Sequence, residues 1–115
     1  MKTYRQQLII TSDQPEQFLN LSYEVEECVR RSLITDGLCV VYSQHTTSAV
    51  FLENDREELY SDWSKMLGKI VPHESDYKVD YSSAGAAHMK QMLLGASVTV
   101  PITDGRMELG PRQYI

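Results

Sequence analysis

The residues best suited to chemistry in this chain are three histidines, His45, His73 and His88. His45 stands in a short polar string, 44–47, between two apolar runs, and His88 lies inside an apolar stretch. A buried neutral imidazole needs partners for both ring nitrogens, and a metal ion supplies one of them. Two interpretations of His45 therefore stay open: a divalent metal site shared with His88, or a polar turn satisfied by its own hydrogen bonds.

A metal site built on these two histidines would need a third protein ligand. A catalytic zinc ion normally has three protein ligands and one open position. The chain offers four candidates for the third: His73, Glu53, Asp76 and Asp80. The sequence alone does not choose among them.

The acid–amide pair Glu53-Asn54 follows the second apolar run and suggests a different chemistry. Glu53 could act as a general base, and Asn54 could position a substrate through its amide. Each residue also has a structural explanation. Asn54 can cap a helix, with Glu57 completing a capping box, and Glu53 can be a solvated strand end.

Thr46 and Thr47 follow His45 directly and could hold a phosphate group through their backbone N–H groups. Threonine is also common at turns, so this assignment stays open. The chain contains no GxxxxGK[ST], GxGxxG, GxSxG or HExxH motif. NTPase, Rossmann, hydrolase-elbow and zincin functions therefore have no support.

Size and composition predict one globular domain over residues 1–115, with 42% hydrophobic and 23% charged residues. The net charge of −5 argues against nucleic-acid binding, which needs clustered Lys and Arg. No stretch approaches the ~18 apolar residues of a membrane span, and the N-terminus lacks a signal-peptide pattern. Cys28 and Cys39 fit free buried thiols in a reducing compartment. We therefore expect a cytoplasmic protein.

The elements that must position these residues can be predicted from periodicity. Strands are expected over stretches rich in Val, Ile, Leu and Phe: 3–11, 38–42, 49–52, 96–102 and a returning arm at 106–109. Leu8, Ile9 and Ile10 of the first strand are expected to be buried. Residues 18–21 are a further, short candidate. Helices are expected over 22–33, from Asn54 to Pro72, and over 84–94, the last buried on more than one side.

Trp63 belongs to the apolar stripe of the second helix, which favours core packing over a binding role. This order favours an α+β fold, with a mostly antiparallel sheet and about three helices packed on it.

Three segments together resemble the YjbQ family, also called the secondary thiamine-phosphate synthase family. They are VYSQHTTSAVFLEND, VP…Y…AAHMK and MLLGASVTVPITDGRMELG, and the resemblance runs from about residue 37 to the last residue. It implies a YjbQ-like α+β fold, a homotrimer and a metal-binding histidine cluster near the subunit boundary. For some members it also implies synthesis of thiamine phosphate from a pyrimidine pyrophosphate and a thiazole phosphate. On this resemblance the metal ligands are His45 and His88, the metal is divalent, such as zinc, and the acid–amide pair is Glu53-Asn54.

The chain departs from the family pattern at the predicted site. The family usually carries Tyr-x-His before the third helix, and here Val79 occupies the histidine position. Val79 cannot coordinate a metal. Arg112 replaces a usual Trp, and its guanidinium could hold a phosphate bidentately. The chain also stops where relatives usually continue, which describes a divergent and C-terminally short member.

Two functions follow from these observations. In the first, the protein is a metal-dependent, phosphate-handling enzyme of the thiamine-phosphate synthase type. His45 and His88 then bind the metal and Glu53 handles protons, while the phosphate is held by Thr46, Thr47 and Arg112. In the second, the protein is a non-catalytic, divergent homotrimer that keeps the scaffold with a degraded metal site.

Overall fold

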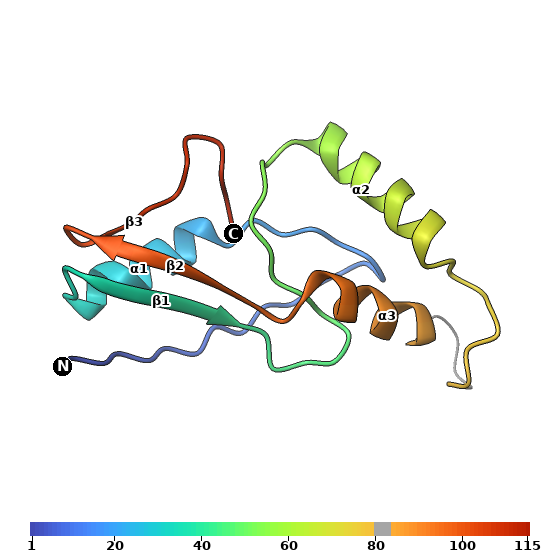
Figure 1. Ribbon diagram of the computed structural model, residues 1–115, viewed down its shortest axis with the longest axis horizontal. Helices are drawn as coiled ribbons and strands as arrows, with labels where there is room; N and C mark the ends of the chain where they lie inside the picture. The colour runs from blue at the N-terminus through green and yellow to red at the C-terminus, as the bar shows by residue number, and fades with distance from the viewer. Residues whose placement is uncertain (80–83) are drawn as a thin grey trace.

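The computed structural model describes residues 1–79 and 84–115 and has the predicted α+β architecture (Figure 1). The described elements follow in the order α1 (Ser22–Ser32), β1 (Gly37–Tyr42), α2 (Glu57–Ile70), α3 (Ala84–Leu94), β2 (Ser97–Thr103) and β3 (Arg106–Met107). Helix α1 lies against the sheet, whereas α2 and α3 extend beyond one end of it (Figure 1). None of these helices is long and apolar enough to cross a membrane.

The sheet is antiparallel with the strand order β1-β2-β3. β1 pairs with β2 along its whole length, from Gly37 opposite Ile102 to Tyr42 opposite Ser97. The predicted hairpin turn is confirmed, since Asp104 (φ 53°) and Gly105 (φ 77°) both adopt the left-handed backbone that a tight two-residue hairpin requires.

The core lies between α1 and the inner face of the sheet. Val25 of α1 is buried with Val50 and Ile115, and Cys39 and Val41 of β1 pack against them. The outer face of β1 is uncovered, because Leu38, Val40 and Tyr42 are all more than 60% exposed. Both cysteines are free and half-buried rather than buried, and burial raises the pKa of the Cys39 thiol.

Three of the predicted strands do not form. Residues 3–11 pair with no strand in the described chain, and Ile9 and Ile10, which were expected to be buried, are 90% and 46% exposed. The runs 18–21 and 49–52 are irregular and lead only to an isolated bridge between Glu53 and Tyr114. Strand-like composition makes a strand only where a second segment supplies the ladder of hydrogen bonds, and among residues 1–79 and 84–115 these runs have no such neighbour.

The predicted cap of α2 is also wrong. The helix begins at Glu57 after an extended Arg56, and none of the described side chains caps it. The Asn54 side chain accepts instead a hydrogen bond from the N–H of Asp55 (2.8 Å), forming a local turn. The chain therefore turns for two more residues before the helix starts.

Helix α3 ends as predicted, at Gly95 in the left-handed conformation (φ 91°). Its burial is smaller than predicted. Gly85 and Ala86 are buried, but Met92 and Leu93 are 72% and 57% exposed. The buried residues lie in the first turn of the helix and the exposed ones in its last turns, so α3 is packed at its N-terminal end and open towards its C-terminal end.

Candidate functional site

A closed polar loop follows β1 and carries His45. The N–H of Ser43 donates to the carbonyl of Ala96 (2.8 Å), which fixes the start of the loop to the chain between α3 and β2. The hydroxyls of Ser43 and Ser48 hydrogen-bond across the base of the loop. Residues 44–47 therefore form a short loop tip, and the hydrogen bonds of Ser43 and Ser48 fix the chain on either side of it.

The hydrogen bonds of the loop assign the tautomer of His45. The backbone N–H of Thr47 donates to Nδ1 of His45 (3.1 Å), and the Thr47 hydroxyl lies 2.8 Å from the same nitrogen. A backbone N–H can only donate, so Nδ1 must keep its lone pair. The neutral ring then carries its proton on Nε2, and His45 offers the N–H of Nε2 as a hydrogen-bond donor.

An open hollow of about 520 Å³ lies between this loop and α3. Its lining offers hydroxyl, amide and imidazole groups beside a comparable apolar surface and, among the described residues, contains no carboxylate, Lys or Arg. The lining residues are Tyr42, Ser43, Gln44, His45, Thr46, Gln91 and Ala96. The hollow can thus offer several neutral donors to one ligand.

The residues predicted to complete a metal site are not brought together with His45. His88 is half-buried on α3, one turn before Gln91, but does not line the hollow. Asp80 lies outside the described residues. Across 1–79 and 84–115, no three His, Cys, Asp or Glu side chains are grouped as metal ligands.

In this conformation, the hydrogen bond to His45 leaves its ring without a free lone pair for a metal ion. A metal needs a lone pair, and the only lone pair of the assigned tautomer, on Nδ1, already accepts the Thr47 N–H. Val79, where the resemblance leads us to expect a histidine, is a 37% exposed hydrocarbon. Metal binding by His45 and His88 therefore stays a prediction from the resemblance.

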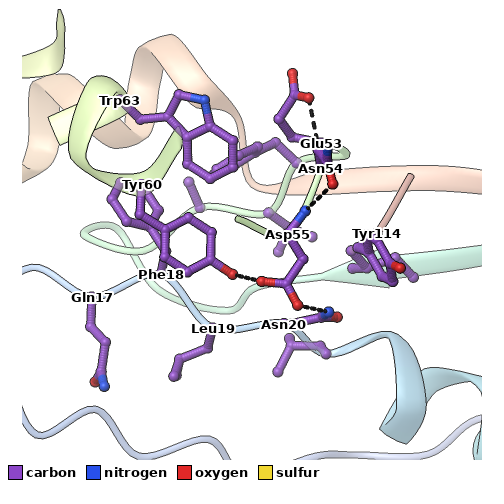
Figure 2. A pocket seen from close by; sticks show the side chains of 15 residues that line it. Gln17, Phe18, Leu19, Asn20, Glu53, Asn54, Asp55, Tyr60, Trp63 and Tyr114 are labelled. Carbon is purple, nitrogen blue, oxygen red and sulfur yellow. Dashed lines mark hydrogen bonds between the residues drawn. The ribbon is translucent and has the colours of Figure 1, made fainter. Parts of the chain in front are cut away.

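The other predicted residues occupy separate parts of the structure. Thr46 lines the hollow, and Thr47 orients His45. Arg112 is exposed in the turn after β3 and is not part of the hollow's lining. Glu53 and Asn54 line a second cavity, of about 100 Å³ (Figure 2).

Five of the fifteen residues that line this second cavity are aromatic, and four of these rings pack against one another. Their ring centroids are 5.2–6.3 Å apart, and the rings belong to Phe18, Phe51, Tyr60 and Trp63. We call this space the aromatic cavity. The sequence predicted that Trp63 packs in the core. In the structure its side chain is only half-buried, so that prediction describes just part of its environment.

A hydrogen-bonded carboxylate stands beside these rings. The Tyr60 hydroxyl donates to one oxygen of Asp55, and the Asn20 amide donates to the other (2.7 Å; Figure 2). Burial and the Asp55 carboxylate raise the pKa of Tyr60 to about 12. Hydrogen bonds from Tyr60 and Asn20 lower the pKa of Asp55.

Sequence reasoning missed this group. Asp55 and Tyr60 are five residues apart at the start of α2, which matches no motif, and Asn20 is distant in sequence. The available signal was the concentration of Tyr60 and Trp63 on one helix. Nothing in the sequence indicated that Phe18 and Phe51 would join them.

Comparison with known proteins gives a consistent family. A family model described as "UPF0047 protein YjbQ-like" matches residues 6–115. A UPF0047 protein of Methanothermobacter thermautotrophicus is 33% identical over all of this chain and 81% of its own length. Another, of Archaeoglobus fulgidus, is 37% identical over 86% of this chain and 77% of its own length. A crystal structure of an uncharacterized YjbQ/UPF0047-family protein of Clostridium acetobutylicum superposes with a TM-score of 0.85 at 31% identity, over 91% of this chain and 81% of that one.

Proposed function

The chain belongs to the YjbQ (UPF0047) family, and we propose that it is a phosphate-handling enzyme of the thiamine-phosphate synthase type. Its ligand site in this proposal is the hollow beside His45. The reaction class comes from the resemblance described above, in which a pyrimidine pyrophosphate and a thiazole phosphate are joined. The choice of site comes from the geometry of the loop.

The observation that carries the proposal is the fixed tautomer of His45. A phosphate oxygen only accepts hydrogen bonds, and the N–H of Nε2 is a donor held in place by Thr47. Gln44 and Gln91 add amide donors to the same hollow. Because no carboxylate lines the hollow among the described residues, an anion would meet no negative side chain that repels it there.

The proposal assigns different work to different residues. His45 contacts the phosphate, and Thr47 positions His45 without touching the ligand. Thr46 supplies a further hydroxyl at the rim of the hollow. Glu53 and Asn54 line the aromatic cavity instead, so proton transfer by Glu53 stays a separate prediction.

Calorimetric titration with pyrophosphate tests the binding step. We expect saturable binding to the unmodified chain and loss of binding in His45→Ala. Thr47→Val keeps the backbone donor to Nδ1 but removes the hydroxyl, so we expect a smaller loss. His73→Ala is the matched control, because His73 is exposed and does not line the hollow.

The reaction itself is tested separately, with the pyrimidine pyrophosphate and the thiazole phosphate and detection of thiamine phosphate by mass spectrometry. Product formation that depends on His45 supports the whole proposal. Pyrophosphate binding without product limits it to ligand binding. Pyrophosphate titration curves that are the same for His45→Ala and the unmodified chain would remove the hollow as the site.

The departure at Val79 favours a second candidate function, a non-catalytic homotrimer with a degraded metal site. In that case Val79→His should increase zinc affinity, because it restores the family's histidine position. Light scattering should also give a mass of about three chains. A monomer, or a Val79→His variant with unchanged zinc affinity, would count against this alternative.

A further inference from the structure

Beyond the His45 hollow, we infer that the aromatic cavity binds a small organic cation of the quaternary-ammonium class. The lining of this cavity brings four aromatic rings together with the Asp55 carboxylate (Figure 2). This inference is independent of the function proposed above, which uses other residues.

The rings provide the attraction that such a cation needs. Tyr60 and Trp63 of α2 pack against Phe18 from the loop before α1, with centroids 5.5 Å and 5.3 Å away, so a cation would contact the sides of these rings that line the cavity. Phe51, from the segment after the His45 loop, completes the group at 5.4 Å from Trp63. Aromatic faces carry negative charge density, so a cation placed against them is attracted without a hydrogen bond.

The charges around the cavity select the sign of the ligand. Its lining contains two carboxylates, Glu53 and Asp55, and no Lys, Arg or His side chain among the described residues. Asp55 is held by Tyr60 and Asn20, one to each oxygen, so the negative charge has a fixed position. A phosphate would meet these carboxylates, whereas a cation would be drawn to them.

The size of the cavity limits the ligand to a small head group. A volume of about 100 Å³ equals the liquid volume of roughly three water molecules. A trimethylammonium group matches this scale and presents a methyl surface to the rings. It cannot donate a strong hydrogen bond, which agrees with the aromatic and aliphatic part of the lining.

The fluorescence of Trp63 provides a direct assay, because Trp63 is the single tryptophan of the chain. The probe is choline, and the control ligand is dimethylbutanol, in which carbon replaces the charged nitrogen. We expect choline to change the emission of Trp63 in a saturable way, with roughly millimolar affinity. Dimethylbutanol should bind at least several-fold more weakly, because it keeps the shape but not the charge.

Two variants, each lacking one carboxylate of the lining, test whether choline binds in this cavity. Asp55→Asn and Glu53→Gln should each weaken choline binding several-fold without changing the binding of dimethylbutanol. Asp62→Asn is the matched control, since Asp62 is exposed on α2 and does not line the cavity. Circular dichroism verifies that each variant is folded, and Glu53→Gln carries the test if Asp55→Asn does not fold.

Equal affinity for choline and dimethylbutanol would overturn the inference, because the cavity would then be merely apolar. Unchanged choline binding in both charge-removing variants would overturn it as well. So would a fluorescence of Trp63 that neither ligand alters.

Discussion

The hydrogen bond from Tyr60 to Asp55 makes a testable contribution to stability. Tyr60→Phe removes the hydroxyl and leaves the ring among Phe18 and Trp63, so packing is preserved. A hydrogen bond to a charged group contributes about 1.5–3 kcal/mol. Because Asp55 is exposed, solvent screening reduces this to roughly 1 kcal/mol. We therefore expect the free energy of unfolding to fall by about 1 kcal/mol at neutral pH.

The pKa shifts define the pH range in which this difference exists. The pKa of Tyr60 is raised to about 12 in the folded protein, against ~10 in an unfolded chain. Its contribution is complete below pH ~10 and is lost as the pH rises through about 12. The pKa of Asp55 is lowered, so its contribution is present above ~3.9 and is lost as the pH falls through the lower folded value.

Urea unfolding of both proteins, followed by Trp63 fluorescence and far-UV circular dichroism, measures this difference. We expect the gap between the unmodified chain and Tyr60→Phe to shrink between pH ~10 and ~12. Tyr23→Phe is the control, because Tyr23 is 71% exposed on α1, and it should change stability by less than ~0.5 kcal/mol. A gap that is absent at neutral pH, or that stays constant through pH ~12, would refute the reasoning.

Three core and backbone substitutions, measured by scanning calorimetry, test other parts of the structure. Gly68→Ala should stabilise α2 by about 0.5–1 kcal/mol, because no atom lies within 4 Å of the added Cβ; a lower melting temperature would contradict this. Gly85→Ala should destabilise the protein by roughly 1–3 kcal/mol, because its Cβ would overlap the ring of Tyr77; an unchanged melting temperature would show that the ring moves freely. Val100→Ala should cost roughly 1–3 kcal/mol, since Val100 is only 1% exposed, and a near-zero change would mean that the core refills the space.

The parts of the fold that the sequence predicted are those with local signals. Gly95 ended α3 because its backbone adopts a conformation that other residues avoid. Asp104-Gly105 formed the hairpin for the same reason, and the strands on either side of it then pair in register. These features depend on a few neighbouring residues, which a sequence displays directly.

One error arose where a distant partner decides the outcome, and another where a hydrogen bond to a neighbouring residue competes with helix capping. Residues 3–11 have strand-like alternation, but alternation does not name a pairing segment, and none is provided within the described chain. Asn54 is a residue type that often caps helices, yet its side-chain oxygen accepts a hydrogen bond from the N–H of Asp55 instead. Local hydrogen bonds of this kind compete with capping.

The candidate site was predicted in part. The sequence placed His45 in a polar string after an apolar run, and the structure puts it at a hollow in a closed loop after β1, an edge strand; its chemistry stays a prediction. Its tautomer depends on a contact with Thr47 that only coordinates reveal. The aromatic cavity was not predicted, since its four rings come from three separate segments and the sequence records no sign of their meeting.

The central claim is that His45 holds an oxyanion with the N–H of Nε2. A proton–nitrogen correlation spectrum of the histidine side chains tests it most directly, recorded at a pH where the ring is neutral and during titration with pyrophosphate. His45→Ala assigns the signals. We predict that His45 carries its proton on Nε2 in the free protein and that its ring signals shift until pyrophosphate saturates. A proton on Nδ1, or ring signals that pyrophosphate leaves unchanged, would contradict the account.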